Sequence, residues 1–570
     1  MKKSILFLSI IVWGLLVMTS SCRKYETQPK DWFTSELTFD SLDKNGTVTA
    51  FNLNNIYTYL PTGYNWVDLD FLDAGTDDAL PSRINATVEN YSKGTVNLIN
   101  NPDPYWGTAY YGIRRANIFL KNVVRTPISA SNMQFWKAEA RFLRAYFYWE
   151  LLKRYGGVPL LGDTVLGLND HIEIPRATYA ETVDYIVKEC TAIKDSLRAD
   201  PASDAEWGRA SKGAAVALKC RVLLYAASPL FNGGGVESDA TKKALTGYLT
   251  ADATRWQKVA DAVTEFKALG YYNLVPAGTA PAGFINVFIN KKNTEIIFAR
   301  QSPNSSTLEN FQSPVGYTVS NVQCYGLTSP SQNLVDAFPM RNGLAITDAG
   351  SGYNAANPYA SRDPRLDATV FYNGLMWLNR TVKTYQGGAD KPDNPTTSQV
   401  QTRTGYYLRK FLGSFTSGNG FSNQSHNFPI FRFAEILLTN AEALNELGLV
   451  ENAVAEIIRL RTRAGITAGS GNRYGIKAGI TQTEMRELIR NERRIELAFE
   501  EHRFWDIRRW KIASQVMNAP ITGMKITNGT PLTYQVVTVA NPVFQNRLYH
   551  MPIPYDEILK NPKLIQNEGW

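Results

Sequence analysis

Residues 132–157 read NMQFWKAEARFLRAYFYWELLKRYGG, and this stretch decides the fold class. Apolar side chains recur along it at steps of three and four: Phe135, Ala138, Phe142, Ala145, Trp149 and Leu152. Polar and basic side chains follow the same rhythm on another face, which is typical of an amphipathic helix. The pattern predicts a helix over 132–155 that stops at Gly156-Gly157, with Pro159 just beyond.

Four further stretches carry helical signals. The Ala-rich segment 211–227 and the segment 253–269 each predict one helix. The segments 433–447 and 451–464 predict a pair of helices joined by a tight turn at Gly448. Ala-rich helix pairs of this kind are the unit of a tetratricopeptide-like scaffold, although the period is too irregular for a clean repeat array.

The last long helix is predicted over 482–501 and begins with a capping box of Thr481 and Glu484. Glu492 falls in its apolar stripe, and a carboxylate that faces a core must be paired. Between residues 490 and 509, six arginines stand among five acidic residues. This near balance predicts an internal ion-pair network and argues against a nucleic-acid patch.

The composition and the hydrophobic periodicity change between about residues 271 and 430. Gly, Ser, Asn, Pro and Tyr dominate there, and apolar stripes of helical spacing are few. Short extended pieces are predicted at 295–299 and 405–409. A stretch this long without periodicity is usually a functional or elaborated surface region. The predicted fold is therefore mostly α, with a helical-pair scaffold at about 36–270 and 431–570 and a loop-rich subdomain at about 271–430 packed on it.

The first residues predict export. Lys2 and Lys3 precede an apolar zone from Ile5 to Met18, which is too short to span a membrane. The small residues 19–21 then lead directly to Cys22, which is the order of a secretory signal. The pattern resembles a bacterial lipoprotein box, although Thr19 stands where such boxes usually have leucine or valine. We expect a signal peptide at 1–21, a lipidated Cys22 with a polar tether to about residue 35, and one globular unit at 36–570. An ordinary secretory signal without lipidation is the alternative.

The composition is that of a globular protein, with 44% hydrophobic and 20% charged residues. The net charge of +8 is spread along the chain, so no nucleic-acid partner is expected. The cysteines beyond Cys22 are Cys190, Cys220 and Cys324, which are too widely spaced for a disulfide framework. Buried free thiols are the favoured interpretation, and a Cys190–Cys220 bridge stays open.

Several motifs occur in an order that is specific for one family. They are RRANIFL at 114–120, AEARFLRAYFYWELLKRYGGVPL at 138–160, WGRASKGAAVALKCRVLLYAASPLFN at 207–232, FRFAEILLTNAEALNELG at 431–448, IRNERRIELAFEEHRFWDIRRW at 489–510 and HMPIPYDEILKNPKLIQNEGW at 550–570. Together they span almost the whole chain. The chain resembles the SusD/RagB family of outer-membrane lipoproteins, the nutrient-binding partners of TonB-dependent transporters.

The resemblance implies four tetratricopeptide-like helix pairs with the irregular region packed against them. It also implies a lipid-anchored protein at the outer membrane, facing the cell exterior. Such a protein closes over a SusC-like TonB-dependent transporter and delivers oligosaccharide to it or, in some relatives, peptide. Ligand contacts in this family come from variable loops, so no contact residue is carried over.

Sugar chemistry points to candidate ligand contacts. A sugar ring stacks its C–H face on Trp or Tyr, while its hydroxyl rim needs side chains that donate and accept hydrogen bonds. One loop fits this requirement through Tyr64, Asn65, Trp66, Asp68, Asp77 and Asp78. A second candidate is Trp377, with Tyr372, Asn373, Asn379 and Arg380 around it, and a third and weaker one is Tyr325. For each of them the competing interpretation is an aromatic or polar residue that covers the edge of the core.

Enzymatic readings have less support. Asp77 and Asp78 are adjacent, whereas glycoside hydrolysis needs two carboxyl groups about 5–9.5 Å apart across a bond. The four histidines lack metal-ligand spacing, and the sequence has no GxSxG or GxxxxGK motif. We expect a non-catalytic binding protein without cofactor or metal. A surface glycoside hydrolase and a pure helical interaction scaffold are the rivals from other classes.

Overall fold

The computed structural model describes residues 38–64, 67–167, 170, 172–319, 322–392, 401–413 and 423–570. The signal segment, Cys22, Asn65, Trp66 and His171 lie outside these residues. The long helices are α3 (Thr47–Tyr57), α5 (Trp106–Asn122), α6 (Ala130–Tyr155), α7 (Tyr179–Ile193), α8 (Lys212–Ala227), α10 (Thr254–Lys267), α15 (Phe433–Glu446), α16 (Val450–Ala464) and α17 (Gln482–Glu496). The short ones are α4 (Glu89–Ser92), α9 (Ala240–Thr246), α11 (Ala282–Ile289), α12 (Thr307–Gln312), α13 (Gln332–Ala337), α14 (Pro364–Thr369), α18 (Arg503–Arg509), α19 (Ala513–Val516) and α20 (Tyr555–Lys560).

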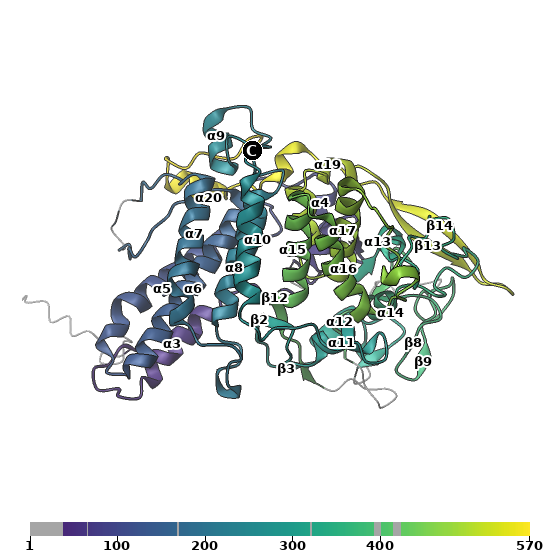
Figure 1. Ribbon diagram of the computed structural model, residues 1–570, viewed down its shortest axis with the longest axis horizontal. Coiled ribbons are helices and arrows are strands. Elements are labelled where there is room, and N and C mark those ends of the chain that lie inside the picture. The colour runs from purple at the N-terminus through teal and green to yellow at the C-terminus, as the bar shows by residue number, and fades with distance from the viewer. Residues whose placement is uncertain are drawn as a thin grey trace, which may run out of the picture.

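The long helices pack in a continuous series. Helix α5 packs on α6, α6 on α7, α7 on α8, and α8 on α10. Helix α10 then packs on α15, which in turn packs on α16 and α17. Figure 1 shows α5 to α10 in one half of the molecule and α15 to α17 in the other. The mostly helical scaffold predicted from the sequence is therefore confirmed, and α10 and α15 are neighbours although the whole loop-rich region separates them in the chain.

The loop-rich region leaves the scaffold and returns to the same place. Strand β2 (Ile296–Arg300) lies near its start, and strand β12 (Phe428–Arg432) leads directly into α15. The two strands pair antiparallel, which brings both ends of the region together. The remaining strands also form two-stranded pairs: β1 (Ala79–Pro81) with β6 (Thr328–Pro330), β3 (Asn304–Ser305) with β11 (Gln424–Ser425), β4 (Thr318–Val319) with β5 (Val322–Gln323), β7 (Val370–Phe371) with β10 (Tyr407–Leu408), β8 (Met376–Trp377) with β9 (Arg380–Thr381), and β13 (Ile521–Thr527) with β14 (Thr533–Ala540).

Helix α6 differs from the expected amphipathic pattern. From Ala138 to Tyr155 nearly every side chain is buried, including charged ones. The reason is that α3, α5 and α7 all pack on this helix, and Met551 in the C-terminal segment donates its N–H to the Arg154 carbonyl at 2.8 Å. The charges are satisfied inside: Glu150 pairs with Arg154 at 2.5 Å and with Lys153 at 2.9 Å. The C-terminal half of the helix is therefore buried on all sides, and its charged residues form buried ion pairs where the sequence predicts a solvent-facing polar stripe.

Helix α17 begins as predicted and ends early. Thr481 Oγ1 accepts from the Glu484 N–H at 3.2 Å, and Glu484 Oε2 accepts from the Thr481 N–H at 2.8 Å, so the capping box is present. The helix ends at Glu496, not at residue 501. Phe499 takes a left-handed backbone conformation, and its N–H donates to Asp73 Oδ1 at 3.0 Å. The Asp73 side chain, from a distant segment, thus accepts a hydrogen bond that a carbonyl of α17 would accept if the helix continued.

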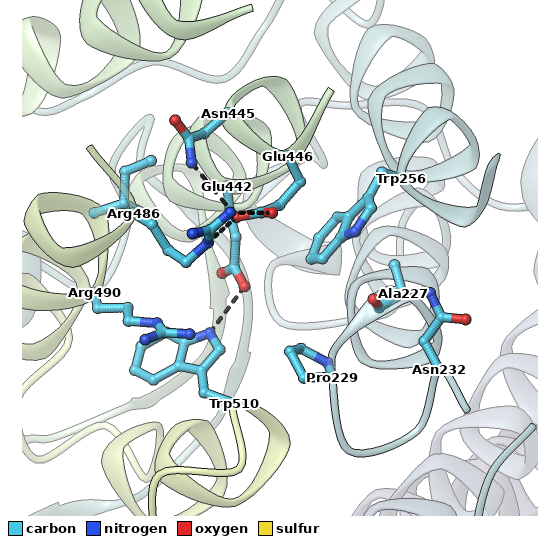
Figure 2. A pocket seen from close by; sticks show the side chains of 11 residues that line it. Ala227, Pro229, Asn232, Trp256, Glu442, Asn445, Glu446, Arg486, Arg490 and Trp510 are labelled. Atoms are coloured by element: carbon cyan, nitrogen blue, oxygen red, sulfur yellow. Dashed lines mark hydrogen bonds and ion pairs between the residues drawn. The ribbon is translucent and has the colours of Figure 1, made fainter. Parts of the chain in front are cut away.

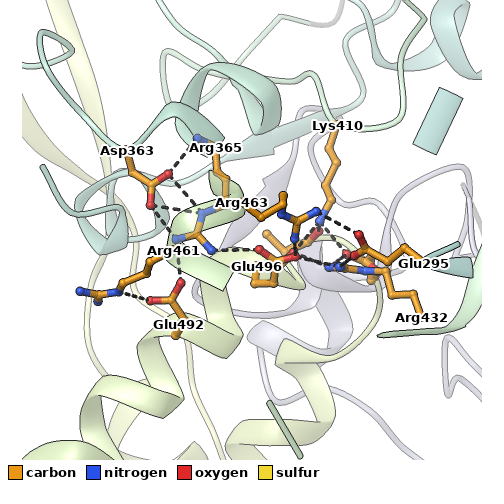
Figure 3. Close-up of polar contacts among 11 residues, drawn as sticks. Glu295, Asp363, Arg365, Lys410, Arg432, Arg461, Arg463, Glu492 and Glu496 are labelled. Atoms are coloured by element: carbon orange, nitrogen blue, oxygen red, sulfur yellow. Dashed lines mark hydrogen bonds and ion pairs between the residues drawn. The ribbon is translucent and has the colours of Figure 1, made fainter. Parts of the chain in front are cut away.

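A buried network of charges joins the loop-rich region and strand β12 to α16 and α17 (Figure 3). Arg432 lies at its centre, 2.8 Å from Glu295, 2.7 Å from Glu496 and 2.6 Å from Glu500. Glu492 lies 2.7 Å from Arg365 and 2.9 Å from Arg461, which confirms the pairing expected for this carboxylate. In the described part of the chain, the carboxylates of the network are Glu295, Asp363, Glu492, Glu496 and Glu500, and its cations are Arg365, Lys410, Arg432, Arg461 and Arg463.

The network fixes the charge state of its members. Burial alone would raise the pKa of Glu496, but the guanidinium groups of Arg463, Arg432 and Arg365 hold it well below its ordinary value. Burial lowers the pKa of the Lys410 ammonium to about 8, against the pull of Glu500. The balance of acids and bases is what allows so many charges to be buried together.

The cysteines of the described residues are buried free thiols at positions 190, 220 and 324, so no Cys190–Cys220 bridge forms. Burial raises the pKa of the Cys324 thiol to about 12. Among the described helices, none combines the length and the apolar character that a bilayer crossing requires.

The network generates a stability prediction. Arg432→Met should lower the free energy of unfolding by about 3–5 kcal/mol, because it removes the central cation and leaves Glu295, Glu496 and Glu500 as a buried cluster with an excess of negative charge. The matched control is Arg473→Met, whose ion pair with Glu451 has side chains 24% and 63% exposed. The control should cost less than about 1 kcal/mol. Urea unfolding of the chain starting after Cys22 measures both, and equal losses would contradict the role assigned to the network.

Candidate functional site

The first predicted loop is anchored by Tyr64. Its ring packs against Phe411 at 5.0 Å and Phe428 at 5.2 Å between ring centroids, and its hydroxyl donates to the Asn427 carbonyl at 3.0 Å. Tyr64 is half-buried, so it ties the loop to the core and is not itself an open platform. Asn65 and Trp66 follow it directly in the chain but lie outside the described residues.

Tyr325 is the exposed aromatic among the described candidates. Its side chain is 39% exposed, and its ring meets Phe311 edge-on at 5.8 Å. Its backbone N–H donates to the Asn310 carbonyl at 2.9 Å. Both contacts come from helix α12. The helix therefore holds Tyr325 in place on its buried side, while the rest of the ring is exposed to solvent.

Helix α12 also reaches the Tyr64 loop through Glu309, which is fully buried. One Glu309 oxygen accepts from Gln424 Nε2 at 2.9 Å and from the Gly413 N–H at 3.2 Å, and it lies 2.8 Å from His426 Nε2. The His426 ring lies 6.4 Å from the ring of Tyr64. Glu309 thus holds both ends of segment 414–422, which lies outside the described residues. Tyr64 and Tyr325, far apart in sequence, are therefore both connected to α12, and we call the surface around α12 that contains Tyr325 and the edge of Tyr64 the α12 face.

Trp377 does not offer a stacking platform. Its side chain is only 4% exposed, and its ring packs against Tyr317 at 5.0 Å and Phe371 at 4.8 Å. Successive side chains of a strand point to opposite faces, so Met376, 59% exposed, is the outward member of β8. The expectation that Trp377 contacts ligand is thus corrected to the competing one, an aromatic covering the edge of the core.

The polar neighbours of Trp377 are mostly engaged inside as well. Tyr372 is buried and donates its hydroxyl to Asp367 Oδ1 at 2.6 Å, and buried Asn373 accepts from the Thr384 N–H at 3.1 Å. Arg380 pairs with Asp390 at 2.8 Å and covers the ring of Tyr317. Asn379 is exposed. The Tyr317 hydroxyl donates to the Trp377 carbonyl at 3.2 Å, which ties the hairpin to the segment just before β4.

Asp77 and Asp78 are structural. Asp77 lies 2.7 Å from Arg494 and 2.8 Å from Arg503, and Asp78 lies 2.5 Å from Arg494. Both aspartates are buried. Burial alone would raise the pKa of Asp77, but Arg494 and then Arg503 lower it below its ordinary value. The two carboxylates therefore tie their segment to the end of α17 and to α18, which favours the competing interpretation of a structural role over ligand contact.

Asp68 is exposed and accepts from the Thr87 N–H and hydroxyl at 3.1 and 3.0 Å. Of the predicted contacts in the described residues, Asp68 and Tyr325 therefore remain accessible. Sequence reasoning missed the exposed apolar side chains that accompany them, Val322 at 51% and Met376 at 59%. Sequence reasoning could not find them, because they lie in very short strands of a region that has no hydrophobic periodicity. Within the described residues, no group of three or more His, Cys, Asp or Glu side chains is arranged to hold a metal ion.

Two family models match this chain. One, described as the SusD family, matches residues 294–570, and the other, described as starch-binding and associating with the outer membrane, matches residues 26–224. A solved SusD-like protein from Bacteroides fragilis superposes with a TM-score of 0.76 at 30% identity, over 94% of this chain and 99% of that chain. The chain belongs to the SusD family.

Other relatives agree with this assignment. A SusD-like carbohydrate-binding protein from Bacteroides fragilis is 25% identical, with a TM-score of 0.73 over 92% of this chain and 99% of that chain. SusD-like protein P2 of Formosa agariphila is 25% identical over 84% of this chain and 82% of its own length. The present SusD-family chain is thus a member of a carbohydrate-binding family that associates with the outer membrane. The α12 face draws on both matched ranges, since Tyr64 lies in one and Tyr325 in the other.

The burial of the β8 strand can be tested directly. Trp377→Ala should lower the free energy of unfolding by about 3–5 kcal/mol, because it empties space between Tyr317 and Phe371. Its neighbour Met376 supplies the control, since Met376→Ala removes an exposed side chain and should change stability by less than about 0.5 kcal/mol. Thermal or urea unfolding distinguishes the two variants. Unchanged stability in Trp377→Ala would show that the indole is not part of the core.

Proposed function

We propose that this chain captures oligosaccharides at the cell surface with the α12 face and delivers them to a SusC-like TonB-dependent transporter. The observation that carries the proposal is the connection of two described tyrosines to helix α12: the exposed Tyr325 contacts it directly, and Tyr64 is linked to it through His426 and Glu309. An exposed aromatic ring beside polar groups suits a sugar ring, whose apolar face stacks while its hydroxyls form hydrogen bonds. The descriptions of the matching family and of the Bacteroides fragilis carbohydrate-binding relative support a glycan as the ligand class.

The lipoprotein box supports the location. A lipid on Cys22 would hold the chain at the outer membrane, facing the exterior, and the polar residues that follow would act as a tether. The family description, which names association with the outer membrane, supports the same location.

Binding should depend on the aromatic side chains of the α12 face. Tyr325→Ala and Trp66→Ala should each weaken the affinity for the bound glycan about tenfold, equal to about 1.4 kcal/mol of binding free energy. Isothermal titration calorimetry of the chain starting after Cys22 measures this against starch, β-glucan, xylan and mannan oligosaccharides and a set of peptides. The control is Tyr111→Ala, because Tyr111 is a 65% exposed tyrosine on α5, away from the α12 face.

Three results would count against this proposal. Binding only to peptides would change the proposed ligand class from glycans to peptides. Release of shorter sugars from the titrated glycan would favour a hydrolase. Equal losses in Tyr111→Ala and Tyr325→Ala would remove the α12 face as the site.

Lipidation gives a separate prediction. Cys22→Ser should abolish incorporation of labelled palmitate and release the protein from the membrane fraction, because serine lacks the thiol that takes the lipid. Radiolabelling followed by membrane fractionation in a bacterial host checks both results. Retained label in Cys22→Ser would show that another residue carries the lipid or that the box is not used.

A further inference from the structure

A cavity lies on the helical scaffold, between the end of α8, the start of α10, the last turns of α15 and the middle of α17 (Figure 2). Its open space is about 160 Å³. One water needs roughly 10–15 Å³ on the same measure, so the cavity has room for a small molecule. The lining residues that matter are Trp256, Asn445, Glu446, Arg486, Arg490 and Trp510.

The cavity is remote from the α12 face. Helix α15 starts directly after β12, beside the loop-rich region, and the cavity lies at its last turn, where it contains Asn445 and Glu446. At 1.5 Å per residue, the 14 residues of α15 place the cavity about 20 Å from β12. Figure 1 shows this end of α15 on the side of the scaffold opposite β2, β3 and β12. Trp256 also falls between the ranges that the two family models match, 26–224 and 294–570.

Trp256 provides an aromatic surface. It stands in the first turn of α10 and is half-buried. Within the described residues, its ring makes no aromatic or cation–π contact and its indole N–H has no hydrogen-bond partner. Figure 2 shows it across the opening from Trp510 and Arg490. Trp256 therefore packs partly on the scaffold and lies at the mouth of the cavity.

Trp510, in contrast, is a fixed wall. Its side chain is 4% exposed, and its Nε1 donates to Glu442 Oε1 at 2.8 Å. The guanidinium carbons of Arg509 and Arg490 lie 4.7 and 5.3 Å from the ring centroid. Because these groups occupy Trp510, the stacking surface of the cavity is Trp256.

The polar lining suits an uncharged ligand. Arg486 donates to both oxygens of Glu446, at 2.6 and 2.8 Å, and both side chains keep some exposure. Asn445 is fully buried, and its Oδ1 has no hydrogen-bond partner in the described residues. The charges are paired: Arg486 with Glu446, Arg509 with Glu442 at 2.6 Å, and Arg490 with Glu487 at 2.7 Å, so a charged ligand gains no net attraction. The lining offers both donors and acceptors, as hydroxyl groups require.

We propose that this cavity binds one neutral pyranose ring, with its C–H face on Trp256 and its hydroxyls on Glu446 and Arg486. The scaffold would then carry a carbohydrate site of its own, separate from the α12 face. This inference goes beyond the proposed function, since it does not depend on which ligand the α12 face takes. The size of the cavity favours a single ring, and its charge balance disfavours phosphate, uronate or amino sugars.

The experiment uses fluorine NMR of the chain starting after Cys22, labelled with 5-fluorotryptophan. Trp256→Phe assigns the Trp256 resonance by its loss. The probes are glucose, galactose, mannose and xylose as methyl glycosides, with glucuronate and glucosamine as charged counterparts. We expect a saturable shift of the Trp256 resonance with one or more neutral probes, at millimolar affinity. Arg486→Ala should weaken that affinity about tenfold, because charge-assisted hydrogen bonds are lost.

The controls separate this site from the α12 face. Trp570→Phe replaces another half-buried tryptophan outside the cavity and should leave the Trp256 titration unchanged. Tyr325→Ala should also leave it unchanged, even where that variant loses oligosaccharide binding by calorimetry. The inference is overturned if no neutral probe shifts Trp256, if only charged probes do, or if Arg486→Ala binds as tightly as the parent. A fluorine spectrum of Arg486→Ala without sugar shows whether that variant is folded.

Discussion

The buried ion-pair network around Arg432 and Glu496 is the constraint on which the rest of the structure depends. Each of these charges is costly to remove from water, and the cost is offset only when every partner is in place. The partners come from segments far apart in sequence: Glu295 before β2, Arg365 in α14, Lys410 near β10, and glutamates of α17 and the turn after it. The network therefore forms only when the loop-rich region is docked on the helices. This is how a region whose strands are mostly two or three residues long is held in one arrangement.

The same network positions the α12 face. Lys410 donates to Glu500 at 2.7 Å, and the next residue, Phe411, packs its ring on Tyr64. Glu309 then connects the neighbouring segments through Gly413, Gln424 and His426. A rigid base beneath variable loops lets a protein family change its ligand without changing its fold. In this chain the rigid support consists of buried ion pairs and aromatic rings, and the exposed Tyr325 lies at its surface.

Buried and exposed aromatic residues have different roles here. The rings of α6, together with Trp377 and Trp510, fill space or hold charged partners, whereas Tyr325 and Trp256 keep part of their surface open. The two open rings lie at opposite ends of the scaffold helices, one on loops and one on a helix. A binding protein with two such surfaces can hold a ligand in transit while its helices stay rigid, because neither surface needs the core to move.

The sequence by itself determined the helices α6, α8, α10, α15 and α16, the start and capping box of α17, the need of Glu492 for a partner and the family. These features depend on neighbours three or four residues away or on ordered motifs, so local spacing is enough to predict them. Only the tertiary structure decided which arginines pair with Glu492, that α17 ends at Glu496, and that Asp77 and Asp78 are engaged by Arg494 and Arg503. It also decided that Trp377 is buried while Tyr325 and Trp256 are accessible. The physical reason is that the partners and the exposure of these side chains are set by tertiary contacts with other segments, such as Arg494 for Asp77 and Tyr317 for Trp377, and local spacing carries no information about them.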